Sequence, residues 1–139
     1  MRLVLDTNVW LDWLVFGDAE VAPLRAAVEQ GRARVFIDAA CEAELARVLA
    51  YPLGRSRLDA AAQSACLAEC RRIAERGEQA ARQAGPLPVC RDPGDQKFLE
   101  LARDCGADLL LTKDSALLEL GRRTPFRILT PRAWAAREA

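Results

Sequence analysis

The chain has 139 residues, and its 20 lysines and arginines balance its 20 aspartates and glutamates, so the net charge is zero. This length suits one domain with a sizeable core, and a neutral balance does not by itself indicate a nucleic-acid partner. The absence of histidine excludes the usual Ser-His-Asp and Cys-His nucleophile systems, so any hydrolytic chemistry must rest on carboxylates.

Short apolar runs alternate with helical patterns along the chain. The first part predicts a strand over 3–5, a helix through Trp10 and Leu14, a helix over 20–31 that ends at Gly31, a strand over 33–38, and a helix over 39–52 that stops before Pro52. The second part predicts one long helix or two shorter ones over 56–85, an extended piece over 87–89, a turn, a helix over 95–107, a strand over 108–112, a short helix over 115–121, a strand over 126–130 and a C-terminal helix from Thr130-Pro131. This alternation predicts one α/β domain over 1–139, with a parallel sheet between helices.

Acidic residues follow most of the predicted strands. Ligands of open parallel sheets bind outside the carboxyl ends of the strands, so residues at these positions are candidates for a site. They are Asp6 after the first strand, Asp38 with Glu42 and Glu44 after the second, Asp92 and Asp95 after the 87–89 piece, and Asp114 with Thr112 after the strand over 108–112.

Carboxylates brought together repel one another, and a proton or a cation must relieve the repulsion. Arg91 and Lys113 are the basic residues within these motifs. A hard divalent cation is therefore the simplest partner, and all-oxygen ligation favours Mg²⁺ or Mn²⁺ over zinc.

Several of these residues also have a structural interpretation. Asp38 fits a helix N-cap, and Asp92 before Pro93-Gly94 fits a turn. Asp95 and Asp114 could also cap helices, but their positions after extended segments favour a functional role. On the helix over 39–52, Glu44 flanks the buried face and is chosen over Glu42.

Packing explains the remaining candidate ligands and aromatic residues. Trp10 and Trp13 lie one helical turn apart and are interpreted as core. Cys66 and Cys70 are also one turn apart, but there is no CxxC pair, and the five cysteines are interpreted as reduced thiols.

The sequence also bears on location and on a basic region. No apolar run approaches the roughly 20 residues of a membrane span, and the N-terminus is typical of a strand rather than a signal peptide, so we expect a cytoplasmic protein. Arginines concentrate in the middle third of the chain, and two interpretations of them remain: a solvated helix face or a patch that contacts phosphate groups. These are Arg55, Arg57, Arg71, Arg72 and Arg76.

Four segments carry a resemblance to a known family. They are "LVLDTNVW", "EAELARVLAYP", "RDPGDQKFLELARDCGADLLLTKDSALLEL" and "RILTPRAW", in that order, and the similarity spans Arg2 to about Trp134. In these segments the chain resembles PIN-domain nucleases, in particular the bacterial toxins of toxin–antitoxin systems that are related to the VapC type. The resemblance implies a three-layer α/β/α sandwich around a central parallel sheet of four to five strands.

The same resemblance implies a function and its partners. It implies an endoribonuclease that uses Mg²⁺ or Mn²⁺ and a metal-activated water to cleave single-stranded RNA, acting as a toxin with a protein antitoxin and as a homodimer. The metal-binding and catalytic quartet that it implies is Asp6, Glu44, Asp95 and Asp114, with Asn8, Thr112 and Asp92 as supporting residues. Ala116 stands where the family often has a second Asp, which leaves one or two metal ions open.

Two alternatives belong to other functional classes. One is a non-catalytic PIN-fold module that binds RNA or protein, for which Ala116 leaves room, although such a module has no need of mutually repelling acids. The other is a phosphatase of the haloacid-dehalogenase type, which needs a second Asp as general acid where this chain has Asn8. Because an amide cannot protonate a leaving group, this second alternative is disfavoured.

Overall fold

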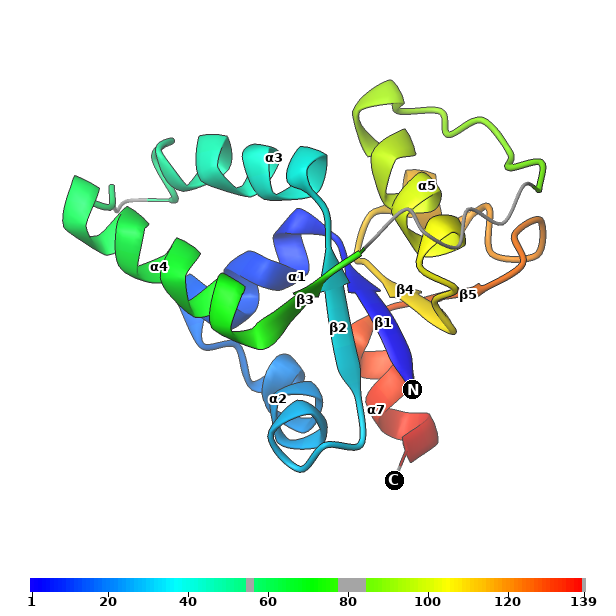
Figure 1. Cartoon of the computed structure of the whole chain (residues 1–139), viewed down its shortest axis with the longest axis horizontal. Coiled ribbons are helices and arrows are strands. Elements are labelled where there is room, and N and C mark those ends of the chain that lie inside the picture. Colours follow the sequence, from blue (N-terminus) through cyan, green and yellow to red (C-terminus); the bar gives the residue numbers. More distant parts are fainter. Residues whose placement is uncertain (55–56, 78–84, 139) are drawn as a thin grey trace.

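A five-stranded parallel sheet forms the centre of the computed structural model, which describes residues 1–54, 57–77 and 85–138 (Figure 1). The strand order is β3-β2-β1-β4-β5, and every neighbouring pair is parallel. The strands are β1 (Arg2–Leu5), β2 (Arg34–Ile37), β3 (Ala74–Arg76), β4 (Leu109–Leu111) and β5 (Arg127–Leu129). The predicted α/β sandwich with a parallel sheet is therefore confirmed.

Helices cover the sheet between successive strands. They are α1 (Thr7–Leu11), which continues as a π-helical turn over Asp12–Phe16, α2 (Ala22–Glu29), α3 (Ala39–Leu49), α4 (Ala60–Ile73), α5 (Gln96–Asp104), α6 (Ser115–Leu118) and α7 (Pro131–Glu138). Short 3-10 turns over Ala19–Val21 and Pro93–Asp95 precede α2 and α5. Figure 1 shows α2 and α4 on one side of β2 and β1 and α5 on the other. No helix in the described ranges is long and apolar enough to span a membrane.

The central strands are buried on both faces. Leu3, Val4 and Leu5 of β1 are at most 1% exposed, and Leu110 of β4 is fully buried. Such continuous apolar strands are typical of parallel sheets with helices on each face. Leu3 pairs with Val35 of β2 on one side and with Leu109 of β4 on the other, which fixes β1 at the middle of the sheet.

The fifth strand lies at a position that the sequence did not predict. The extended piece over 87–89 forms no strand, whereas Ala74–Arg76, predicted to be helical, forms the edge strand β3. The pairing of β3 with β2 is reinforced by two contacts of 2.7 and 2.6 Å between the Arg34 guanidinium and the Glu75 carboxylate. Long-range pairing thus overrides the helical propensity of these residues. The remainder of the predicted helix, 78–84, lies outside the described residues.

Other local predictions are confirmed. Gly31 and Gly106 have φ angles of 73° and 64° just beyond α2 and α5, where a left-handed residue terminates a helix. Trp10 and Trp13 are buried, with ring centroids 6.0 Å apart. All five cysteines are free thiols.

Asp38 caps α3, because its Oδ1 accepts a hydrogen bond of 2.9 Å from the Cys41 N–H. We expect Asp38→Ala to lower the free energy of unfolding by about 1 kcal/mol in a urea titration. Asp38→Ser keeps a capping oxygen and should lose less. Equal losses for the two variants would show that the cap is not the source of the effect.

Candidate active site

Several of the predicted acidic residues meet at the carboxyl edge of the sheet, whereas Asp38 and Glu42 serve elsewhere. Asp6 follows β1 directly, Asp114 follows β4 and caps α6, and Asp95 stands at the N-cap position of α5 without a side-chain capping bond. Because β1 and β4 are parallel neighbours, their carboxyl ends place Asp6 and Asp114 beside each other. The 3-10 turn over Pro93–Asp95 carries Asp95 to the same place.

Asp6 is buried and held from two sides. Its side chain accepts a hydrogen bond of 2.7 Å from the Thr112 hydroxyl, and its backbone N–H donates to the Leu111 carbonyl at 3.0 Å. Burial raises the pKa of Asp6, and the negative charges of Asp114 and Glu44 raise it further, against the lowering by the Thr112 hydrogen bond. The position of Asp6 therefore favours either a proton or a nearby cation.

Asp92, Asp95 and Asp114 form a cluster in which one carboxylate oxygen of each lies within 4.8 Å of the others. One oxygen of Asp92 accepts from the Gly94 N–H at 2.9 Å, and one oxygen of Asp114 accepts from the Ala116 N–H at 3.0 Å. These hydrogen bonds fix the carboxylates, because each is tied to its own turn. The Asp95 Oδ2 atom is buried and has no hydrogen-bond partner among the described residues.

The cluster changes the acidity of its members. Burial raises the pKa of Asp95 to about 8, and the hydrogen bond to Asp114 and the negative charges of Asp6, Asp114 and Asp92 act in the same direction. The pKa of Asp114 is lowered, first by the hydrogen bond from Asp95 and then by that from the Ala116 N–H. Without a cation, the raised pKa of Asp95 therefore favours the protonated form of this carboxyl at neutral pH.

Glu44 reaches the site from α3 but lies outside the three-aspartate cluster. Its Oε1 is 2.6 Å from the ammonium of Lys97, and its Oε2 accepts a hydrogen bond from the Thr7 hydroxyl. Thr7 follows Asp6 directly, and no local pattern indicates that its hydroxyl pairs with Glu44. Thr7 and Thr112 are therefore two hydroxyl groups that each fix one acidic residue of the site.

Glu42 points from α3 toward α4 and β3, away from the acidic site, as the comparison of Glu42 with Glu44 predicts. Its two carboxylate oxygens lie 2.6 Å each from the guanidinium groups of Arg71 and Arg76. Arg72 pairs with Glu69. These arginines of the basic region are thus engaged by glutamates, whereas Arg57 is exposed and Arg55 lies outside the described residues.

The predicted supporting residue Asn8 is exposed. In the described part of the chain, its side chain makes no hydrogen bond to the acidic residues. Asp12 is 7% exposed and lies 2.5 Å from the ammonium of Lys113, the neighbour of Asp114. In the sequence, the single charged residue between the apolar residues Leu11 and Trp13 could have indicated that Asp12 is buried and needs a cationic partner.

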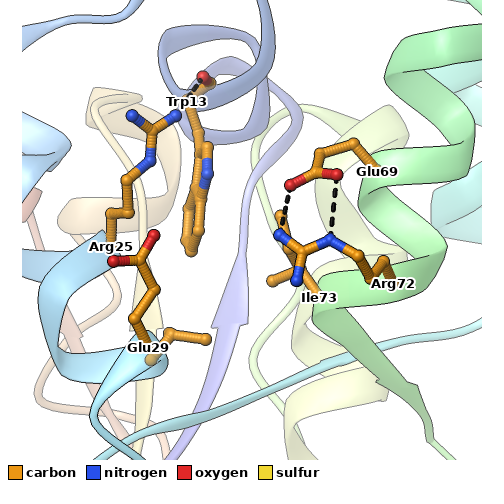
Figure 2. Close-up of a pocket in the computed structure, with 7 residues that line it drawn as sticks. Trp13, Arg25, Glu29, Glu69, Arg72 and Ile73 are labelled. Atoms are coloured by element: carbon orange, nitrogen blue, oxygen red, sulfur yellow. Dashed lines mark hydrogen bonds and ion pairs between the residues drawn. The ribbon is translucent and has the colours of Figure 1, made fainter.

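A separate cleft of about 480 Å³ lies between α2 and α4 and holds none of these acidic residues (Figure 2). Figure 2 shows the Arg25 side chain beside the Trp13 ring on one wall and the Arg72–Glu69 ion pair on the other. The Arg25 guanidinium also donates to the Trp13 carbonyl at 3.2 Å. The charges of Arg25 and Arg72 are therefore already engaged within the chain.

Comparison with known proteins is consistent with this architecture. Residues 2–116 match the PIN domain model, so the chain belongs to the PIN domain family. A solved structure that it resembles is that of VapBC2 from Rickettsia felis bound to a DNA fragment from their promoter. The match has a TM-score of 0.61 and 17% identity, and it covers 93% of this chain and 97% of the other. No curated protein gives a significant match.

Proposed function

We propose that this chain is a metal-dependent endoribonuclease that hydrolyses phosphodiester bonds of single-stranded RNA. The observation that carries the proposal is the three-aspartate cluster at the carboxyl edge of a PIN-domain sheet, in which the buried Asp95 Oδ2 has no hydrogen-bond partner within the described part of the chain. A buried carboxylate oxygen without a hydrogen bond is costly, and a bound cation would remove that cost.

The donor set fits a hard divalent cation such as Mg²⁺ or Mn²⁺. Asp92, Asp95 and Asp114 offer carboxylate oxygens only, and histidine is absent from the chain. We propose that Asp6 and Glu44 act together with these three aspartates at the cation site. When bound, such a cation lowers the pKa of a water molecule and offsets charge on phosphate oxygens.

The side chains of the protein would orient these acids. Thr112 Oγ1 donates to Asp6 and accepts from the Asp114 N–H at 2.9 Å, so one hydroxyl fixes residues after both β1 and β4. Thr7 fixes Glu44 in the same manner. A bound cation would lower the raised pKa of Asp95, because a nearby positive charge favours the anionic form of the carboxyl. Ala116 is 5% exposed, so a buried methyl group stands where a further carboxylate would add charge, which favours a single ion.

We further propose that the chain is the toxin of a toxin–antitoxin pair, that it acts in the cytoplasm and that it forms a homodimer. The likeness to VapBC2 from Rickettsia felis supports this reading at the level of the fold. A protein antitoxin would then be a co-purifying partner and would have to be removed before an assay.

The test is cleavage of a mixed single-stranded RNA by the purified chain, freed of any bound protein, with Mn²⁺, with Mg²⁺ and with EDTA. We expect cleavage with either ion and none with EDTA. If the folded chain binds RNA but leaves it intact under all three conditions, the proposed hydrolysis is wrong and a binding module is favoured. Calorimetric titration with Mn²⁺ then distinguishes a metal site from a metal-free scaffold.

A further inference from the structure

Lys97 is a cation placed inside the acidic site. Its ammonium lies 2.6 Å from Glu44 Oε1 and donates to the Gly94 carbonyl, in the turn between Asp92 and Asp95. The side chain is 21% exposed, so it remains accessible from solvent. Lys97 therefore connects the acid of α3 with the turn that carries two aspartates of the cluster.

Stability of the helix does not explain a lysine at this position. Lys97 is in the first turn of α5, where the helix dipole disfavours a positive charge. Helical side chains lean toward the N-terminus, which carries the ammonium over the turn before α5. The nearby acidic groups, together with the Phe98 ring 5.5 Å away, outweigh the unfavourable dipole.

The other cations near the site are engaged elsewhere or lie at its rim. Lys113 pairs with Asp12, and Arg91 pairs with Glu119 at 3.1 Å. Arg47 approaches Glu44 only at 3.8 Å, and its side chain is 58% exposed. A phosphodiester adds negative charge to a site that is already strongly acidic, so a fixed positive charge within reach would favour its binding.

We propose that Lys97 binds a non-bridging phosphate oxygen of the RNA substrate. An ammonium group has three N–H donors, and Glu44 and the Gly94 carbonyl use two of them, which leaves one for the phosphate. Glu44 then serves to aim the lysine as well as to add charge to the site. This inference rests on the proposed nuclease function and assigns Lys97 as a substrate-binding residue of it.

The test is single-turnover cleavage of a short single-stranded RNA in Mn²⁺ across a series of salt concentrations. We expect Lys97→Gln to raise the protein concentration for half-maximal rate about tenfold. The slope of the logarithm of apparent affinity against the logarithm of salt should become shallower by about 0.7, the value for one phosphate contact on a single strand. Lys97→Arg should keep most of the slope. Arg32→Gln, at the opposite edge of the sheet, makes the same charge change and should leave the slope unaltered.

Two further measurements separate this role from simple neutralisation of Glu44. In Glu44→Gln the lysine no longer has its carboxylate partner. The double variant Glu44→Gln/Lys97→Gln then lacks the ammonium as well, so the two variants differ in the ammonium alone and neither carries an unpaired Glu44 carboxylate. If the single and double variants have equal RNA affinity and equal salt slopes, the inference is overturned. Calorimetry with Mn²⁺ alone should show that Lys97→Gln binds the ion at least as tightly as the parent, since a positive charge has been removed. If folded Lys97→Gln no longer binds Mn²⁺, the lysine supports the metal site rather than the substrate, and the inference is overturned.

The failure of this inference differs from failure of the proposed function. A parent chain that cleaves RNA while Lys97→Gln keeps its half-maximal concentration and salt slope overturns the role of Lys97 alone. A folded parent chain that neither binds nor cleaves RNA overturns the nuclease proposal and, with it, the role of Lys97.

Discussion

Replacing Asp114 with Asn is expected to lower the rate of metal-dependent RNA cleavage by about 10³-fold or more. Asn keeps the shape of the side chain and caps a helix as well as Asp does, so the hydrogen bond from the Ala116 N–H survives. What is lost is one negative charge of the three-aspartate cluster, and about 4 kcal/mol of transition-state stabilisation corresponds to this factor. Initial rates at saturating Mn²⁺ measure the effect.

Asp6→Asn is the companion variant and should also lose cleavage. Asp6 is buried with a raised pKa, so removal of its charge is expected to leave the melting temperature equal or higher. An amide oxygen still accepts the hydrogen bond from Thr112. If either variant retains its fold by circular dichroism and cleaves at the parental rate, these acids are not part of the active site.

The second large effect is a dependence of stability on pH and on divalent cations. Burial and the surrounding carboxylates raise the pKa of Asp95 to about 8, so the folded state holds a proton that the unfolded chain releases near 3.8. The stabilisation from this proton is complete below the unfolded pKa and is lost as the pH rises through the folded pKa. The metal-free domain should therefore melt at a lower temperature near pH 8.5 than near pH 5.5.

A bound cation should reverse this loss at high pH. At a hundredfold excess over its Kd, an ion that binds only the folded state adds about 2.7 kcal/mol, or roughly 8 °C in Tm for a domain of this size. Asp95→Asn is the matched control, because it removes the titrating group. This variant should show a smaller fall of Tm between the two pH values than the parent, the remainder coming from the raised pKa of Asp6, and a smaller rise with Mn²⁺. A parent chain whose Tm rises from pH 5.5 to pH 8.5 without metal would contradict the acidic cluster as described.

The sequence predicted the candidate site largely through one topological rule. Asp6 and Asp114 follow short apolar runs that are typical of buried strands, and parallel strands bring their carboxyl ends to one edge. Because the rule needs only the order of strands and the residue after each, it places these acids without any knowledge of packing. The choice of Glu44 over Glu42 came likewise from helical periodicity, and each points to a different set of partners.

The rule does not predict interactions between residues that are distant in the sequence. Ala74–Arg76 carries no strand signal, and its identity as β3 depends on pairing with β2 and on the Arg34–Glu75 ion pair. Thr7 and Thr112 have the same side chain, yet only the packed structure shows that one fixes Glu44 and the other Asp6. Lys97 stands in an ordinary helical pattern, and nothing in that pattern indicates an acidic partner on α3.

The sequence by itself determined the α/β class, the buried central strands and the acidic character of the carboxyl edge. These follow from local hydrophobic patterns and from residue types, which act over a few positions of the chain. Tertiary structure alone decided the edge strand, the raised pKa of Asp95 and the pairing of Lys97 with Glu44. Burial and charge–charge interactions depend on distances through space, and those distances exist only after distant segments have packed together.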